Sequence, residues 1–198
     1  MPALVLAYPI LVHLAVLLHR AELQWLALCC LAAIPLYPGL RAARPRSGLL
    51  LLLAAASLWF LTRAGGGRYA LMIPPVLLPL VGAWFFGRTL AAGKTPLVTR
   101  MALLTHQGQF PQELRRYTRS VTWLWTLVLT GMALLNIGLA LLAPIEIWSL
   151  FTNFINYLIP AVVFPLEYLV RRWRFQYLDH PGFIAFIRMV ATTDYRRL

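Results

Sequence analysis

The sequence predicts an all-α fold, a polytopic membrane bundle of about six transmembrane helices with short interfacial helices on the cytoplasmic face. Of the 198 residues, 61% are hydrophobic and only 12% are charged, whereas a soluble domain is about half apolar and a quarter charged. The apolar residues also form separate runs close to the ~20 residues that cross a bilayer. Basic residues gather between these runs, as they do in loops that flank membrane spans.

Six apolar runs are the expected spans. The first ends before His19 and Arg20, and the loop that follows the second contains Arg44 and Pro45. Three successive glycines lie between the third run and the fourth. Because glycine weakens a helix and favours a turn, we expect the chain to turn there. The spans are expected at residues 3–18, 23–40, 48–62, 69–87, 121–143 and 147–170. Together with a cytoplasmic loop at 88–120 and a tail at 171–198, they form a single membrane domain over residues 1–198.

The fourth span contains Pro74, Pro75 and Pro79. Each proline lacks an N–H group and so leaves one backbone carbonyl without its helical partner. Side chains of neighbouring helices can satisfy such carbonyls inside a membrane bundle. The sequence therefore predicts a bent span that depends on polar groups of its neighbours.

Few polar side chains lie within the spans, and they are costly in lipid. The ones that stand out are His13, Asn136, Asn153 and Asn156. We expect them to face the bundle and to form hydrogen bonds between helices. Aromatic residues at the ends of the last two spans are expected at the headgroup level, namely Trp123, Trp125, Trp148 and Tyr168.

The net charge of +12 favours a defined membrane orientation over nucleic-acid binding. With six spans, fifteen basic residues fall on one side and three on the other. Basic residues collect on the cytoplasmic side, where they fix topology and meet anionic lipid. Both termini are therefore expected in the cytoplasm.

The loop at 88–120 alternates polar and apolar positions at helical spacing. We expect two short helices on the membrane surface, one on each side of a break at residues 108–111, with Leu103, Leu104 and Leu114 turned toward the bilayer. Such helices can anchor to phospholipid, form a pocket for an anionic head group or dock an acidic protein such as an acyl carrier protein. The arginines expected to bind are Arg100, Arg115, Arg116 and Arg119.

A second basic cluster lies at the end of the last span. Glu167 precedes Arg171 by four residues, which predicts an ion pair along one helix, and Arg119 is an alternative partner. Arg172 adds to the positive charge of this end. In the tail, residues 183–190 form an amphipathic segment expected to lie on the membrane.

The sequence gives little support for catalysis. It contains no glycine-rich phosphate loop, no metalloprotease motif and no nucleophile elbow. We predict no metal site and no cofactor. The remaining polar site that a membrane enzyme could use consists of His106, Glu113 and Glu167, so a non-catalytic role is favoured but an enzyme stays open.

Three segments resemble one family. They are TPLVTR at 95–100, PQELRRYTRSVTW at 111–123 and EYLVRR at 167–172. They are similar to bacterial inner-membrane proteins encoded in gene clusters for aryl polyene and xanthomonadin-type pigments, some of which carry a gyrase label that nothing in this sequence supports. The resemblance implies a place beside acyl carrier proteins, biosynthetic enzymes and an exporter, and it transfers no catalytic residue.

Two functions from different classes follow as expectations. The first is an accessory component of aryl-polyene-type lipid or pigment assembly or export, whose basic cytoplasmic face binds an acidic carrier protein or a lipid head group. The alternative is a membrane-embedded acyl- or glycosyl-type transferase that acts at the cytoplasmic interface. A transporter is less favoured, because the spans hold few polar residues and no inverted repeat is visible.

Overall fold

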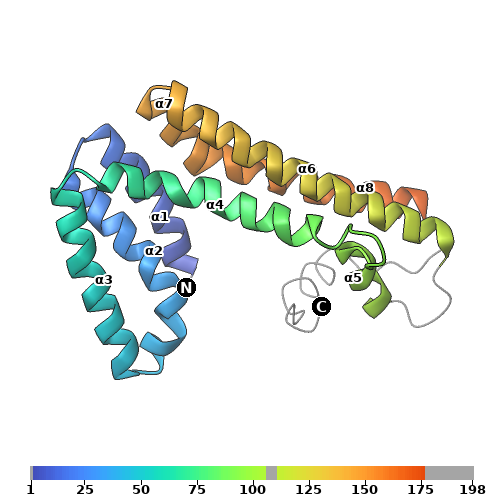
Figure 1. Ribbon diagram of the computed structural model, residues 1–198, viewed down its shortest axis with the longest axis horizontal. Helices are drawn as coiled ribbons and strands as arrows, with labels where there is room; N and C mark the ends of the chain where they lie inside the picture. Colours follow the sequence, from blue (N-terminus) through green and yellow to red (C-terminus); the bar gives the residue numbers. More distant parts are fainter. Residues whose placement is uncertain (1, 106–110, 177–198) are drawn as a thin grey trace. The chain divides into compact units, whose positions relative to one another are not determined.

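The computed structural model describes residues 2–105 and 111–176, and these form helices joined by short turns (Figure 1). The first four helices are α1 (Pro2–Leu17), α2 (Ala21–Arg41), α3 (Pro45–Arg63) and α4 (Gly67–Gly87). They are followed by α5 (Leu97–Thr105) and α6 (Gln112–Leu142). The last helix begins as α7 (Ile145–Leu150), passes through one π-helical turn, η1 (Phe151–Ile155), and ends as α8 (Asn156–Arg174). The all-α prediction is confirmed.

Five helices are long and apolar enough to cross a membrane: α2, α3, α4, α6 and the continuous run from α7 to α8. The first expected span is shorter, with an apolar stretch at Ala3–Leu17. The observed helices begin and end within a few residues of the expected spans, apart from the long extension of α6. The chain is thus built as a multi-pass membrane protein.

The turns follow from the residues that form them. Pro45 occupies the first turn of α3, where a missing N–H group costs nothing. Gly65 has a φ of +80°, a left-handed conformation that glycine adopts easily, and it separates α3 from α4. The same geometry at His19, with a φ of +51°, turns the chain between α1 and α2.

One expectation for the loop at 88–120 is wrong. Residues 112–120 do not form a separate surface helix but begin α6, which runs unbroken for 31 residues. Leu114 does not face a bilayer, because it is 2% exposed and packed inside the protein. Leu103 of α5 is exposed as expected. No proline interrupts the chain between Gln112 and Leu142, so the helix has no reason to end at the membrane surface.

The chain packs as two compact units, and α4, α6 and α8 contribute to both. Unit 1 comprises residues 1–78 and 133–158, and unit 2 comprises residues 79–132 and 159–198 as far as they are described. The expectation of a single membrane domain stays a prediction.

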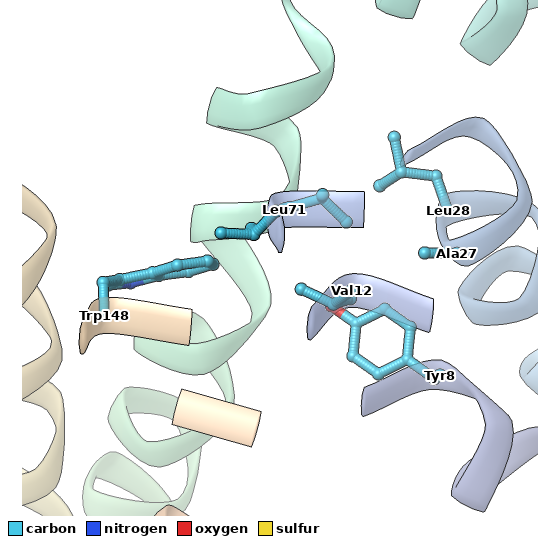
Figure 2. Packing of buried hydrophobic residues seen from close by; sticks show 7 residues of the cluster. Tyr8, Val12, Ala27, Leu28, Leu71 and Trp148 are labelled. Atoms are coloured by element: carbon cyan, nitrogen blue, oxygen red, sulfur yellow. The ribbon is translucent and has the colours of Figure 1, made fainter. Parts of the chain in front are cut away.

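Unit 1 is held together by a cluster of buried apolar side chains (Figure 2). The cluster joins α1, α2, α4 and α7, through Tyr8, Val12, Val16, Ala27, Leu28, Leu71 and Trp148. Figure 2 shows the Trp148 ring reaching from α7 toward Leu71 of α4. Trp148 is 1% exposed, so its expected place at the headgroup level is wrong. Tyr168 is likewise buried, in unit 2.

Helices α2 and α3 form a hairpin with specific side-chain contacts. The Trp25 indole N–H donates to the carbonyl of Ala55 at 2.8 Å and packs edge-on against Trp59. At the end of α3, the guanidinium of Arg63 lies 4.5 Å above the Trp59 ring and 3.6 Å from a carboxylate oxygen of Glu22. Glu22 is near the beginning of α2, so these contacts fix the two helices as antiparallel.

The close approach of Gly39 in α2 to Ser47 in α3 gives a first prediction. A methyl group at Gly39 would collide with the Ser47 hydroxyl, so Gly39→Ala is expected to lower the free energy of unfolding by about 1 kcal/mol. Gly48→Ala is the matched control, because nothing lies within 4 Å of the added carbon and alanine favours the helix. Thermal unfolding in detergent should show a lower Tm for the first variant and an equal or higher Tm for the second. Equal effects would contradict the predicted collision.

Candidate functional site

From the lengths of the apolar helices we infer a membrane boundary within unit 2. About 20 residues of helix cross the hydrocarbon core. Counted from the ends that belong to unit 1, such a span reaches Gly87 in α4, Thr122 in α6 and Pro165 in α8. Both α6 and the run from α7 to α8 continue for about ten residues beyond these positions.

Aromatic rings join α4, α6 and α8 close to these positions. Phe86 of α4 packs against Trp125 of α6 with ring centroids 6.2 Å apart, and Trp125 packs against Phe164 of α8 at 6.4 Å. The three helices therefore reach the boundary side by side. The segments beyond it are α5, residues 112–120 of α6 and residues 167–175, which we call the cap.

Threonine hydroxyls fasten α5 to α6 and to the segment that follows α4. The backbone N–H of Leu97 donates to Thr89 at 3.0 Å, and the N–H of Val98 donates to Thr122 at 3.3 Å. The hydroxyls of Thr99 and Thr118 lie 2.8 Å apart. Two N–H groups at the start of α5, which its own helix leaves unpaired, are thus satisfied by protein side chains. The α5 helix is docked on α6 and does not merely rest on a membrane (Figure 1).

These threonines were not among the predicted site residues, although their spacing in the sequence indicates a shared helix face. Threonines recur every four residues in α6, at Thr118, Thr122, Thr126 and Thr130. Each donates its hydroxyl proton to the carbonyl four residues earlier, at 2.8 to 2.9 Å. A fourfold spacing puts them on one helix face, and a polar face on a span indicates a buried contact.

Glu167 is buried at the junction of α8 with α6. Its carboxylate lies 3.7 Å from the Arg171 guanidinium, which confirms the predicted ion pair one turn apart. The second partner is Tyr117, whose hydroxyl lies 3.3 Å from a carboxylate oxygen and 3.3 Å from the carbonyl oxygen of Glu167 and can donate its single proton to either. Arg119, the expected alternative partner, is exposed instead. The Tyr117 ring also packs edge-on against Phe175 at 5.3 Å, so this cluster joins α6 to the end of α8.

The other arginines of the cap remain on its surface. Those with exposed side chains are Arg115, Arg116, Arg119, Arg172 and Arg174, while Arg100 of α5 is half-buried. The Glu167 carboxylate is paired with Arg171 and so does not neutralise the exposed arginines. The outer surface of the cap is therefore strongly basic. This arrangement can attract phosphate or carboxylate groups.

The polar site considered for an enzyme is not assembled by the described residues. His106 lies outside them. Glu113 is exposed in the first turn of α6, and Glu167 is occupied by Arg171 and Tyr117. Among residues 2–105 and 111–176, no three His, Cys, Asp or Glu side chains come together as metal ligands would.

A second set of polar contacts lies within unit 1. The side-chain amide of Asn136 donates to the carbonyl of Pro75 at 2.6 Å, and the amide of Asn156 donates to the Asn136 side chain at 3.0 Å. The expected hydrogen bonding between helices is therefore observed. Pro75 is the residue four before Pro79, so Asn136 satisfies the carbonyl that the missing N–H of Pro79 leaves free.

The same set extends to α1 and the π-helical turn. His13 lies 3.1 Å from the Ser149 hydroxyl, and the Asn153 amide donates to the Ser149 carbonyl at 2.8 Å. Three buried polar atoms of unit 1 have no hydrogen-bond partner among the described residues: the Tyr8 hydroxyl, the Trp148 indole N–H and the Asn156 side-chain carbonyl. His13, Asn136 and Asn156 thus make the expected contacts between helices, whereas the Asn153 amide bonds to Ser149 within its own continuous helix.

Comparison of the chain with protein-family models, with curated proteins and with solved structures gives no match.

Proposed function

We propose that this protein is an accessory component of aryl-polyene-type lipid or pigment assembly or export in the bacterial inner membrane, with the cap in the cytoplasm. Its task is to hold an acidic carrier protein or a lipid head group against the membrane. The observation that carries the proposal is the exposed row of Arg115, Arg116 and Arg119 on a helix that extends about ten residues beyond the membrane boundary.

The contacts of the cap favour a binding role over a chemical one. The carboxylate that a transferase would use, Glu167, is buried and engaged by Arg171 and Tyr117. The threonine contacts make α5 and α6 a fixed platform, so the backbone that carries the arginines need not be ordered when a ligand binds. The pigment context comes from the resemblance of residues 95–100, 111–123 and 167–172 to the family described above.

The proposal is tested by reversing charge on the platform. Arg115→Glu/Arg116→Glu/Arg119→Glu is expected to lower capture of an acyl carrier protein or biosynthetic enzyme at least tenfold in a tagged pull-down from membranes, and to abolish pigment attachment. The altered residues are exposed, so membrane insertion should be unchanged. Arg41→Glu/Arg46→Glu, at the end of α2 and in the first turn of α3, is a control for basic charge elsewhere. Normal pigment in the α6 variant would refute the proposal.

A further inference from the structure

The exposed face of α6 changes its chemistry at the membrane boundary. Arg116, Arg119, Trp123 and Leu127 follow one another at spacings of three and four residues, which puts them on one side of the helix. All four side chains are exposed, Trp123 by 48% and Leu127 by 63%. The face therefore passes from guanidinium groups through an indole to an aliphatic side chain, in the order of a lipid leaflet from head group to acyl chain.

A second helix, α4, is also followed by an arginine next to an exposed tryptophan, which indicates the same head-group level as on α6. Directly after α4, Arg88 stacks on the exposed Trp84, with its guanidinium carbon 4.5 Å from the ring centroid and 4.8 Å from the centroid of the Phe85 ring. Phe86, two residues before Arg88, packs against Trp125 of α6. An arginine thus lies just beyond an exposed tryptophan on both neighbouring helices.

Arg116 and Arg119 differ in their side-chain contacts from four other arginines that lie near helix ends. Arg63, Arg68, Arg88 and Arg171 each stack on an aromatic ring, and Arg63 and Arg171 also pair with a carboxylate. Within the described part of the chain, no ion pair or ring contact involves Arg116 or Arg119. Two guanidinium groups one turn apart, both available, match the several oxygens of a phosphate group.

We propose that Arg116, Arg119 and Trp123 form a binding site for the phosphate of an anionic phospholipid. The guanidinium groups hold the phosphate, the Trp123 ring lies at the glycerol level and the acyl chains run along Leu127. A lipid fits this face better than an acidic protein, because a protein would have to enter the hydrocarbon region to cover Trp123 and Leu127. The site specifies the head group named in the proposed function and rests on the same basic face.

The test is native mass spectrometry of the full chain in detergent, titrated with phosphatidylglycerol and with phosphatidylcholine of the same acyl chains. Arg116→Gln/Arg119→Gln is expected to weaken phosphatidylglycerol binding roughly 30-fold, since each basic residue near the surface contributes several-fold. Phosphatidylcholine binding should change less than threefold. Arg41→Gln/Arg46→Gln, which removes the same charge from the end of α2 and the first turn of α3, should leave the binding of both lipids unaffected.

Two results would overturn the site: unchanged phosphatidylglycerol binding by the α6 variant, or an equal loss in the α2–α3 control. The result is also separable from the proposed function. Lipid specificity without any effect on pigment would leave the site standing and remove the accessory role. Loss of carrier-protein capture by the Arg116→Gln/Arg119→Gln variant, together with unchanged lipid binding, would remove the lipid site and leave the accessory role standing.

Discussion

Replacing Asn136 with leucine is expected to lower the free energy of unfolding by about 2–4 kcal/mol, because two hydrogen bonds are lost inside the bundle. The Asn136 amide is the donor to the Pro75 carbonyl at 2.6 Å, and its side-chain oxygen accepts from Asn156 at 3.0 Å. Asn136 is fully buried, so water cannot take its place. Leu135→Ala, on the neighbouring exposed position, is the control and should cost much less.

A double-mutant cycle identifies the carbonyl involved. The Pro75 carbonyl lacks its helical donor because Pro79 has no N–H group. Pro79→Ala supplies that N–H group, so Asn136→Leu should cost at least about 1 kcal/mol less in the Pro79→Ala background than in the original protein. Unfolding by sodium dodecyl sulfate, titrated into mild detergent micelles, measures all four proteins. An unchanged cost would show that the importance of Asn136 does not come from Pro75.

Hydropathy predicted the spans well because lipid leaves the backbone few alternatives. A chain in hydrocarbon must satisfy its N–H and C=O groups internally, so an apolar run of sufficient length becomes a helix. The span expected at residues 69–87 is observed as Gly67–Gly87, and that at 147–170 lies within the run from Ile145 to Arg174. The prolines did not break α4, as expected, and Asn136 meets the carbonyl that Pro79 leaves free.

The partners of individual side chains were not predictable in the same way. An amphipathic pattern is the same whether its apolar face meets lipid or protein, so Leu114 was assigned to the bilayer although it is buried in the cap. The same ambiguity led to the wrong placement of Trp148. For Glu167, sequence distance alone correctly gave Arg171, but Tyr117 is fifty residues away along the chain and no local rule could select it over Arg119.

The cap should depend on Glu167 as a structural residue. Glu167→Leu removes the carboxylate from the Arg171 ion pair and from the Tyr117 hydroxyl, and we expect a loss of about 1–3 kcal/mol. Losing one member of a fully buried pair costs more, but the Arg171 side chain keeps 14% of its surface exposed. Glu113→Leu is the matched control, because this carboxylate is exposed in the first turn of α6 and should change stability by at most about 0.5 kcal/mol.

Two further variants separate structure from chemistry at this position. Glu167→Gln keeps an acceptor for Tyr117 and should recover part of the lost stability, whereas Glu167→Leu/Arg171→Leu should be less destabilised than Glu167→Leu alone, because no guanidinium then loses its ion pair. Hydrogen exchange of α5 and residues 112–120 should quicken in Glu167→Leu, since Tyr117 connects α6 to the end of α8. If Glu167→Leu left stability and exchange unchanged but abolished pigment attachment, Glu167 would act in chemistry and the transferase alternative would gain its first support.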